Sequence, residues 1–252
     1  MKRTKILKAF LKIYWRIKRV IAPTLKYSQY LYEDILKFYV NPNVTWLDLG
    51  CGHQILPTWR SEEEKRLVGN CKMVVGIDYD LHSLKNHKNI FLKVWGDITK
   101  LPFRDYFFDL VTANMVVEHL DNPDVQFQEI GRILKPGGIF IFHTPNAFGY
   151  TTIMNRLTPN ILKNKLIYLF HGRREEDIFI TYYRANTRQR INSLAKTSGF
   201  EVVKIKMIVS DAQFVIIPPL VILELICIRI LMTKLFKPLG TNIIAILKKQ
   251  QG

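Results

Sequence analysis

One stretch constrains the fold more than any other: an apolar strand that runs directly into a glycine turn. It reads Thr45-Trp46-Leu47-Asp48-Leu49-Gly50-Cys51-Gly52-His53-Gln54. The apolar run indicates a buried strand, and glycines let a ligand approach the backbone closely. A helix predicted over residues 56 to 67 would turn its N–H groups toward the strand end, where open α/β sheets bind ligands. An ordinary strand-to-helix turn has the same pattern, so this stretch alone predicts a site only weakly.

The rest of the chain supplies the elements that such a turn requires. Further buried strands are predicted over residues 73–77, 90–94, 107–113, 139–143, 200–208 and 241–247, and helices over 27–40, 125–134 and 187–198. Apolar strands that do not alternate, separated by helices, predict a parallel sheet covered on both faces. A chain of 252 residues can bury one sizeable core. We therefore expect one domain, residues 44–252, preceded by basic amphipathic helices in residues 1–43.

The formal net charge of +16 is concentrated at the start of the chain. Nine basic residues precede the first acid, Glu33, and make up more than half of the excess. Over residues 5 to 21 the apolar and basic side chains fall on separate stripes of a helix, which suits an anionic membrane surface. A helix packed on its own domain with a solvated basic face explains the pattern equally well. Lysines interrupt every apolar run, unlike a secretory signal.

The cysteines indicate a cytoplasmic setting. Cys51, Cys71 and Cys227 are widely spaced and form no metal-ligand pattern. They predict neither a disulfide framework nor a metal site, which favours a reducing compartment.

Acids recur at the ends of the first three strands in one register. Asp48 lies in the first strand just ahead of its glycine turn, Asp78 follows the second strand and Asp97 follows the third. Core packing alone explains one such acid more readily than three. The repetition predicts a nucleoside site.

Seven short segments then occur in order across residues 44 to 146. They are Leu47-Asp48-Leu49-Gly50-Cys51-Gly52, Gly76-Ile77-Asp78, Gly96-Asp97-Ile98, Leu101-Pro102-Phe103, Phe108-Asp109-Leu110-Val111, Glu118-His119-Leu120 and Leu134-Lys135-Pro136-Gly137-Gly138. In this order they resemble the class I S-adenosylmethionine-dependent methyltransferases, particularly the type 11 group. The resemblance implies a Rossmann-like, seven-stranded, mostly parallel α/β sheet with helices on both faces. Gln54 departs from it, since many members carry a third glycine there.

The resemblance also implies residue roles, with S-adenosyl-L-methionine as the cofactor. Asp48, Gly50 and Gly52 would hold its methionine part, and Asp78 its ribose hydroxyls. Residues that would contact the adenine or border the methyl group are Asp97, Ile98 and Asn114. Carboxylates suit these tasks because they accept hydrogen bonds from hydroxyls and amines.

Residues 145 to 190 are predicted as a helical insertion after the fifth strand that covers the acceptor. The segment 179–187 is similar to methyltransferases of polysaccharide and cell-envelope gene products. Arg173, Arg174 and Arg184 would grip a phosphate on the acceptor. A solvated lid surface is the alternative.

A second insertion, residues 213–237, lies between the sixth and seventh strands and is strongly apolar. Its length approaches that of a spanning helix. A single crossing would put the seventh strand on the wrong side of the bilayer, which argues against spanning. We expect an in-plane helix starting near Pro219, a shallow hairpin or a subunit interface.

The sulfonium of the cofactor supplies the electrophile, so the protein must align an acceptor and, for a hydroxyl, remove a proton. His119 and His143 follow the fourth and fifth strands, and either is a candidate general base, with Glu118 and Tyr182 as weaker candidates. A structural or solvated role is the alternative for each histidine.

We therefore expect methyl transfer to a small-molecule, saccharide or lipid-linked acceptor, at oxygen, by a protein peripheral on the cytoplasmic membrane face. The alternatives are an RNA methyltransferase, whose basic arm would grip phosphates, and a noncatalytic scaffold with a cofactor fold. The RNA alternative is weaker because the arm has an apolar stripe and no recognisable RNA module follows.

Overall fold

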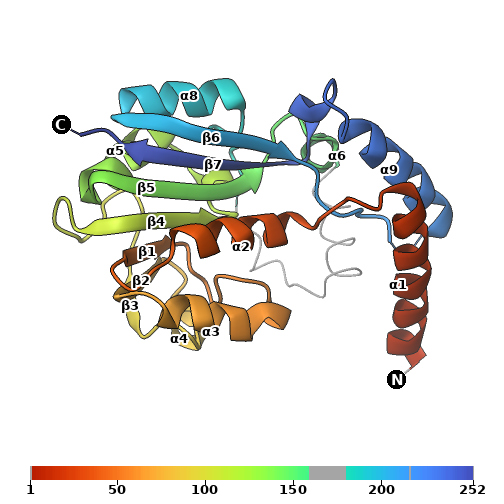
Figure 1. The fold of residues 1–252 in the computed structure, drawn as a ribbon, viewed down its shortest axis with the longest axis horizontal. Coiled ribbons are helices and arrows are strands. Elements are labelled where there is room, and N and C mark those ends of the chain that lie inside the picture. The colour runs from red at the N-terminus through yellow and green to blue at the C-terminus, as the bar shows by residue number, and fades with distance from the viewer. Residues whose placement is uncertain (1, 159–179, 216, 252) are drawn as a thin grey trace.

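A computed structural model describes residues 2–158, 180–215 and 217–251. Its centre is one seven-stranded sheet in the order β3-β2-β1-β4-β5-β7-β6 (Figure 1). The strands are β1 (Thr45–Leu49), β2 (Met73–Asp78), β3 (Leu92–Trp95), β4 (Phe108–Asn114), β5 (Leu134–Pro145), β6 (Phe200–Ile208) and β7 (Asn242–Lys249). β1 to β5 are parallel, and β7 is antiparallel to both β5 and β6. The expected mostly parallel seven-stranded sheet is confirmed.

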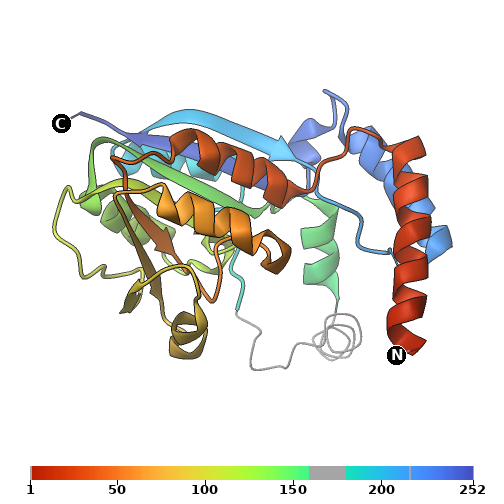
Figure 2. The same ribbon diagram turned by 60° about the horizontal axis from the view of Figure 1, so that its bottom comes forward.

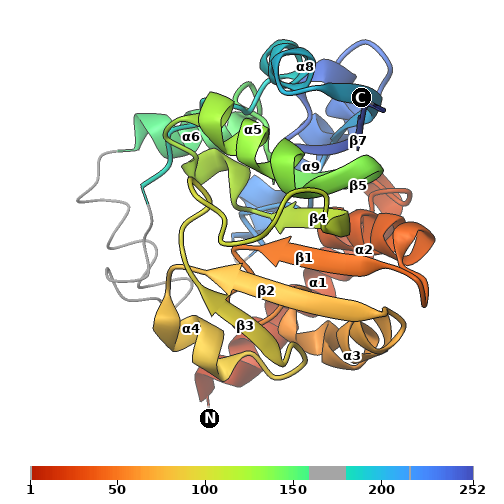
Figure 3. The same ribbon diagram turned by 90° about the vertical axis from the view of Figure 1, so that its left-hand side faces the viewer.

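Helices cover both faces of the sheet (Figure 3). One face carries α2 (Ser28–Tyr39), α3 (Ser61–Gly69) and α4 (Leu81–Asn86), and the other carries α5 (Pro123–Ile133) and α8 (Arg188–Thr197). Each face has its own apolar cluster, because residues of a fully buried strand alternate between two covered faces. The short turns η1 (Thr58–Arg60), η2 (Val117–His119) and η4 (Lys237–Leu239) and helix α6 (Tyr150–Leu157) lie in the connections.

A third apolar cluster lies beyond the sheet, where α1 (Lys2–Ile21) packs against α9 (Pro218–Leu231) (Figure 1). The N-terminal segment is thus divided in the structure: α2 packs on the sheet, whereas α1 packs on the second insertion. Within the described ranges, no helix is both long and apolar enough to cross a membrane. The helix expected near Pro219 is α9.

The helix expected over residues 56 to 67 was wrong at its start. α3 begins only at Ser61, after the turn η1. Pro57 disfavours helical geometry at the residue before it. In addition, Glu64 accepts hydrogen bonds from the N–H groups of Ile55 and Leu56, both at 2.8 Å, which holds them outside the helix. The connection from the glycine turn to α3 is therefore an anchored loop.

Candidate active site

The glycine turn is built as the sequence indicated. Gly50 and Gly52 have φ values of +62° and +51°. The Gly50 N–H donates to the Ile77 carbonyl at 2.8 Å, which ties the turn to the end of β2. A Cβ at Gly50 would lie 2.5 Å from a methyl group of Val116, whereas a Cβ at Gly52 would meet no heavy atom within 4 Å. The turn is therefore closed beneath Gly50 and open above Gly52.

Asp78 lies directly beside this open turn. Its Oδ2 accepts the Gly52 N–H at 2.7 Å, and its Oδ1 accepts the Asp80 N–H at 2.8 Å. Burial raises the pKa of Asp78, although these backbone donors act in the opposite direction. A carboxylate has about four acceptor positions, so Asp78 can still accept a hydroxyl donor besides these backbone groups. The end of β2 thus presents a positioned acceptor.

Asp48 is buried beneath the turn. It lies opposite Thr112 in the parallel register of β1 and β4, and the Thr112 hydroxyl donates to Asp48 Oδ1. That hydroxyl in turn accepts the Trp46 indole N–H at 2.6 Å. Burial raises the pKa of Asp48 to about 8, and the charges of Glu64 and Asp78 add to the effect. The site therefore favours a cation, or a proton, next to Asp48.

Asp97 and Ile98 follow β3, beside the end of β2. The Gly96 N–H donates to the Asp78 carbonyl at 3.1 Å and joins the two strand ends. The Asp97 side chain is exposed and accepts the Thr99 N–H at 2.8 Å, whereas Ile98 is half-buried against the core. An exposed acid and an apolar side chain thus lie next to the Asp78 acceptors.

Asn114 and His143 are joined in one buried polar chain. His143 Nδ1 lies 2.9 Å from Asn114 Oδ1, and its Nε2 lies 3.2 Å from the Asn242 amide. Asn114 also donates to Gln29 of α2 and to the Ile55 carbonyl. His143 is 1% exposed, stacks on Tyr32, and has its pKa lowered by burial to about 3. This environment gives the ring a structural role, so His143 is not carried forward as a base.

His119 lies on η2, near the segment that follows the first insertion. Its Nδ1 is 2.7 Å from the Ile180 carbonyl, which can only accept, so Nδ1 carries the proton in the neutral ring. Nε2 is then the basic nitrogen, and it lies 4.0 Å from Oε1 of the buried Glu118. Burial lowers the pKa of His119 and raises that of Glu118 to about 7. Thr144 donates to Glu118 Oε2 at 2.9 Å and fixes this acid.

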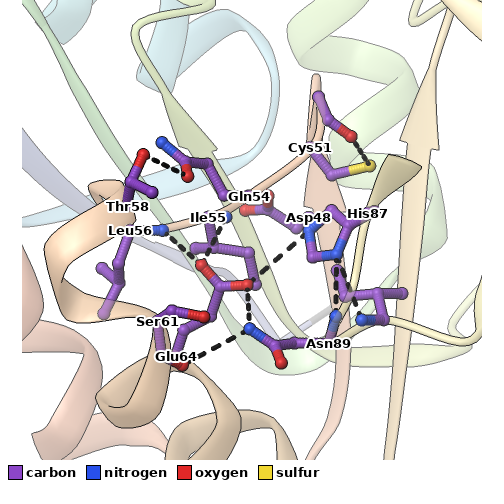
Figure 4. Close-up of polar contacts among 12 residues, drawn as sticks. Asp48, Cys51, Gln54, Ile55, Leu56, Thr58, Ser61, Glu64, His87 and Asn89 are labelled. Carbon is purple, nitrogen blue, oxygen red and sulfur yellow. Dashed lines mark hydrogen bonds and ion pairs between the residues drawn. The ribbon is translucent and has the colours of Figure 1, made fainter. Parts of the chain in front are cut away.

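Glu64 holds the loop that follows the glycine turn (Figure 4). Besides the two loop N–H groups, it accepts the Asn89 side-chain amide at 2.8 Å, and His87 lies next to it. A polar cavity of about 390 Å³ opens here between the loop, α3 and α4. It shares His53 and Gln54 with the turn but is lined by neither Asp48 nor Asp78. The carboxylates at the strand ends, by contrast, keep acceptor capacity that a hydroxyl-bearing ligand can use.

The structure brings Asp48, Gly50, Gly52 and Asp78 together at the adjacent ends of β1 and β2 and sets Asp97 and Ile98 beside them. Sequence reasoning missed the supporting groups Thr112, Glu64 and Gln29. A threonine inside the apolar strand β4, in register with Asp48, was a usable signal for the first. The other two are contributed by helices whose register the local sequence does not define.

Comparison with known proteins agrees with this geometry. The family model described as a methyltransferase domain matches residues 47–142. A Methanosarcina mazei protein, titled as one of the SAM-dependent methyltransferases, superposes with a TM-score of 0.57 at 17% identity, covering 86% of this chain and 98% of that one. At this identity the likeness shows the fold alone.

Three curated relatives align with parts of the chain. A "Probable S-adenosylmethionine-dependent methyltransferase" of Mycolicibacterium smegmatis is 28% identical over 62% of this chain and 51% of its own length. The Malonyl-[acyl-carrier protein] O-methyltransferase of Hahella chejuensis is 31% identical over 39% of this chain and 35% of its own length. The Demethylmenaquinone methyltransferase of Desulfitobacterium hafniense is 29% identical over 47% of this chain and 51% of its own length. The chain thus spans about half or less of the length of these relatives.

Residues 47–142 therefore form a methyltransferase domain, within the fold of the S-adenosylmethionine-dependent methyltransferases. S-adenosylmethionine is the cofactor that this fold implies, and the site fits it. Gly52 leaves open space above the backbone, Asp78 keeps acceptor capacity, and the buried Asp48 favours a cation. When bound, the cofactor supplies an electrophilic methyl group.

Proposed function

We propose that this protein transfers a methyl group from S-adenosylmethionine to an oxygen of a small-molecule, saccharide or lipid-linked acceptor at a membrane surface. The observation that carries the proposal is the unit of the open glycine turn and Asp78, joined by the 2.7 Å bond from the Gly52 N–H. Asp78 accepts the ribose hydroxyls, and Asp48 offsets the ammonium charge of the methionine part. Asp97 and Ile98 contact the adenine, and Asn114 borders the methyl group.

His119 is the proposed general base. The Ile180 carbonyl fixes the proton on Nδ1, so Nε2 carries the ring's basic lone pair and is the atom that takes the proton of an acceptor hydroxyl. Its lowered pKa keeps the ring neutral at pH 7, as a base must be. Glu118, 4.0 Å from Nε2, stabilises the imidazolium that forms.

The acceptor lies on the side of β4 and β5, where the first insertion begins. In the described part of that insertion, Arg184 lies 5.2 Å from the centre of the Tyr182 ring and donates to the Asp121 carbonyl. Its remaining donors suit a phosphate on the acceptor. Arg173 and Arg174 lie outside the described residues. The relatives' names include two different acceptors, so they support methyl transfer without selecting one.

Incubation with methyl-labelled cofactor and separated cell fractions tests the proposal. We expect label in a lipid or glycan fraction and none with the Asp78→Asn variant. Label in RNA, together with salt-sensitive RNA binding, would favour the RNA alternative. Cofactor binding without label in any fraction would favour a scaffold.

The base is tested with His119→Gln. General-base removal typically slows catalysis by about 10²- to 10⁴-fold, while the dissociation constant of the cofactor should not change. The comparison variant His143→Gln should lower unfolding stability and leave the turnover of the folded protein intact. An unchanged turnover in His119→Gln would exclude this residue as the base.

A further inference from the structure

The helices α1 and α9 and the turn η4, with the adjoining segments 22–26, 209–215 and 232–236, form what we call the α1–α9 unit, which projects from the sheet (Figure 2). Its acids are used internally. Asp211 accepts the Tyr14 hydroxyl at 3.0 Å and pairs with the buried Lys18. Glu224 accepts the Tyr150 hydroxyl at 2.7 Å and the N–H groups of residues 213 and 214 at 2.8 and 2.9 Å. The unit is therefore a defined structure rather than a loose arm.

The outer side of α9 is apolar. A single stripe of the helix packs inward, represented by Val221, Leu225 and Ile228. Leu220, Leu223, Ile226 and Ile230 are between 42% and 60% exposed. An apolar groove of about 500 Å³ opens beside them, toward α6. Soluble proteins rarely expose apolar patches of this kind unless the patch contacts a membrane or a partner.

Every exposed charge on the unit is positive in the part that the structure describes. The basic side chains are Lys12, Arg16, Arg19, Lys26, Arg229, Lys234 and Lys237. Across residues 10–26 and 217–239 the sole acid of the sequence is Glu224, which is buried. Trp15, 46% exposed, lies among the cations of α1, and indole rings favour the interface of a bilayer. Exposed apolar side chains on a unit whose described exposed charges are all positive complement anionic lipid.

The geometry favours a helix that lies in the plane of the interface. α9 has 14 residues and is about 21 Å long, against a hydrocarbon core of about 30 Å. In Figure 1 the arrows of β4 and β5 point toward the side on which α1 and α9 lie. Tyr150, at the start of α6, is bonded to Glu224 of α9 and connects the unit to the acceptor side. A bilayer on this unit would face the catalytic edge.

We propose that the α1–α9 unit docks on an anionic lipid bilayer, with the outer side of α9 in the interface and the α1 cations on the headgroups. This proposal rests on the proposed function in one respect, which is that the acceptor comes from the lipid. The docking itself can be measured without any methyl transfer.

The test is co-sedimentation of the full chain with vesicles. Phosphatidylcholine vesicles that contain phosphatidylglycerol should bind it, and phosphatidylcholine alone should bind it far less. The Lys12→Gln, Arg16→Gln, Arg19→Gln triple variant should bind on the order of a hundredfold more weakly. The matched control, Lys65→Gln, Lys85→Gln and Lys196→Gln, removes the same charge from exposed positions elsewhere and should bind like the original chain.

The apolar contribution is tested with Ile230→Glu against Val125→Glu on α5, which are 48% and 41% exposed in the original chain. Ile230→Glu should abolish sedimentation and Val125→Glu should not, while thermal unfolding and cofactor affinity stay unchanged in both. Three results would each overturn the docking proposal: no sedimentation of the original chain, equal binding by the two triple variants, or a lipid-free dimer that Ile230→Glu dissociates. Vesicle binding without methyl transfer would instead support docking and reject the proposed function.

Discussion

The edge of the sheet at the carboxyl ends of β1 and β2 carries the glycine turn, Asp48 and Asp78, and we call it the cofactor edge. Its charged groups are arranged in the opposite way to those of the α1–α9 unit. At the cofactor edge Asp48 and Asp78 are buried, and backbone N–H groups and a threonine hydroxyl hold them. In the α1–α9 unit the half-buried Asp211 and the buried Glu224 hold the helices together, and the cations other than the buried Lys18 are exposed where the structure describes them. A buried acid with unused acceptor positions predicts a small polar ligand, whereas outward cations on an apolar surface predict an extended anionic one.

The two regions also differ in how the chain encodes them. At the cofactor edge the bond from Gly52 to Asp78 joins the ends of β1 and β2, which follow one another in sequence. The bond from Tyr14 to Asp211 spans 197 residues. Local motifs can therefore encode the first region, while the second exists only after the chain has folded. Variants should separate the two.

The largest effect is expected for Gly50→Ala. The new methyl group would lie 2.5 Å from Val116 in a backbone conformation with φ of +62°. Left-handed geometry costs about 1–2 kcal/mol and overpacking about 1–3 kcal/mol, so the free energy of unfolding should fall by roughly 2–5 kcal/mol. Gly52→Ala creates no clash, so it should lose only the cost of left-handed geometry, about 1–2 kcal/mol. Urea unfolding measures both.

Adding Val116→Ala to Gly50→Ala should restore part of the stability, because it removes the clashing methyl groups. A double variant no more stable than the sum of the two single losses would contradict this account of the turn.

Asp78→Asn comes next and acts on cofactor binding. The amide keeps the size of the side chain but loses the charge and replaces one acceptor oxygen with a donor. Charge-assisted hydrogen bonds contribute about 1.5–3 kcal/mol each, so affinity should fall by roughly a hundredfold in calorimetry. Asp109→Asn is the control, since Asp109 pairs with Lys135 and accepts the Thr45 N–H at the opposite end of β4. It should reduce stability only; an equal loss of affinity in both variants would count against the Asp78 assignment.

The pH dependence of stability isolates Asp48. Its pKa is about 8 in the fold and near 3.8 when exposed, so the native state holds an extra proton between these values. Without cofactor, the contribution of this proton is complete below pH 4 and is lost as pH rises through 8, by at most about 1.4 kcal/mol per pH unit. Asp48→Asn should flatten this slope in denaturant titrations from pH 5 to 8. An unchanged slope would show that Asp48 titrates normally.

The elements of the cofactor edge were predictable because short motifs define them. Apolar runs located all seven strands, and the recurring acids Asp48, Asp78 and Asp97 lie at one edge of the sheet, as predicted. The late start of α3 was not predictable, because it depends on Glu64 contacts with Ile55 and Leu56. The burial of His143 was missed for the same reason: Tyr32 and Asn242, which cover it, come from distant parts of the chain.

The α1–α9 unit lay beyond sequence reasoning in a different way. The sequence pattern of α1 fits both a bilayer and a protein partner. In the structure one face of α1 packs against α9, and basic side chains on another face are exposed. A helical period identifies a face but not what covers it.

The smallest effect, and the sharpest separation of the two regions, is expected for Glu224→Gln. Both carboxylate oxygens of Glu224 accept hydrogen bonds, so an amide would present its NH₂ group to a donor. An unsatisfied buried donor costs about 1–3 kcal/mol. This cost should destabilise α9 locally and raise the rate of hydrogen exchange at its backbone amides. Glu201→Gln, on the exposed edge of β6, is the matched control and should change neither quantity. None of the described Glu224 contacts reaches the glycine turn, so cofactor affinity should stay constant. A loss of cofactor affinity in Glu224→Gln would mean that the two regions are energetically coupled through Tyr150 and α6.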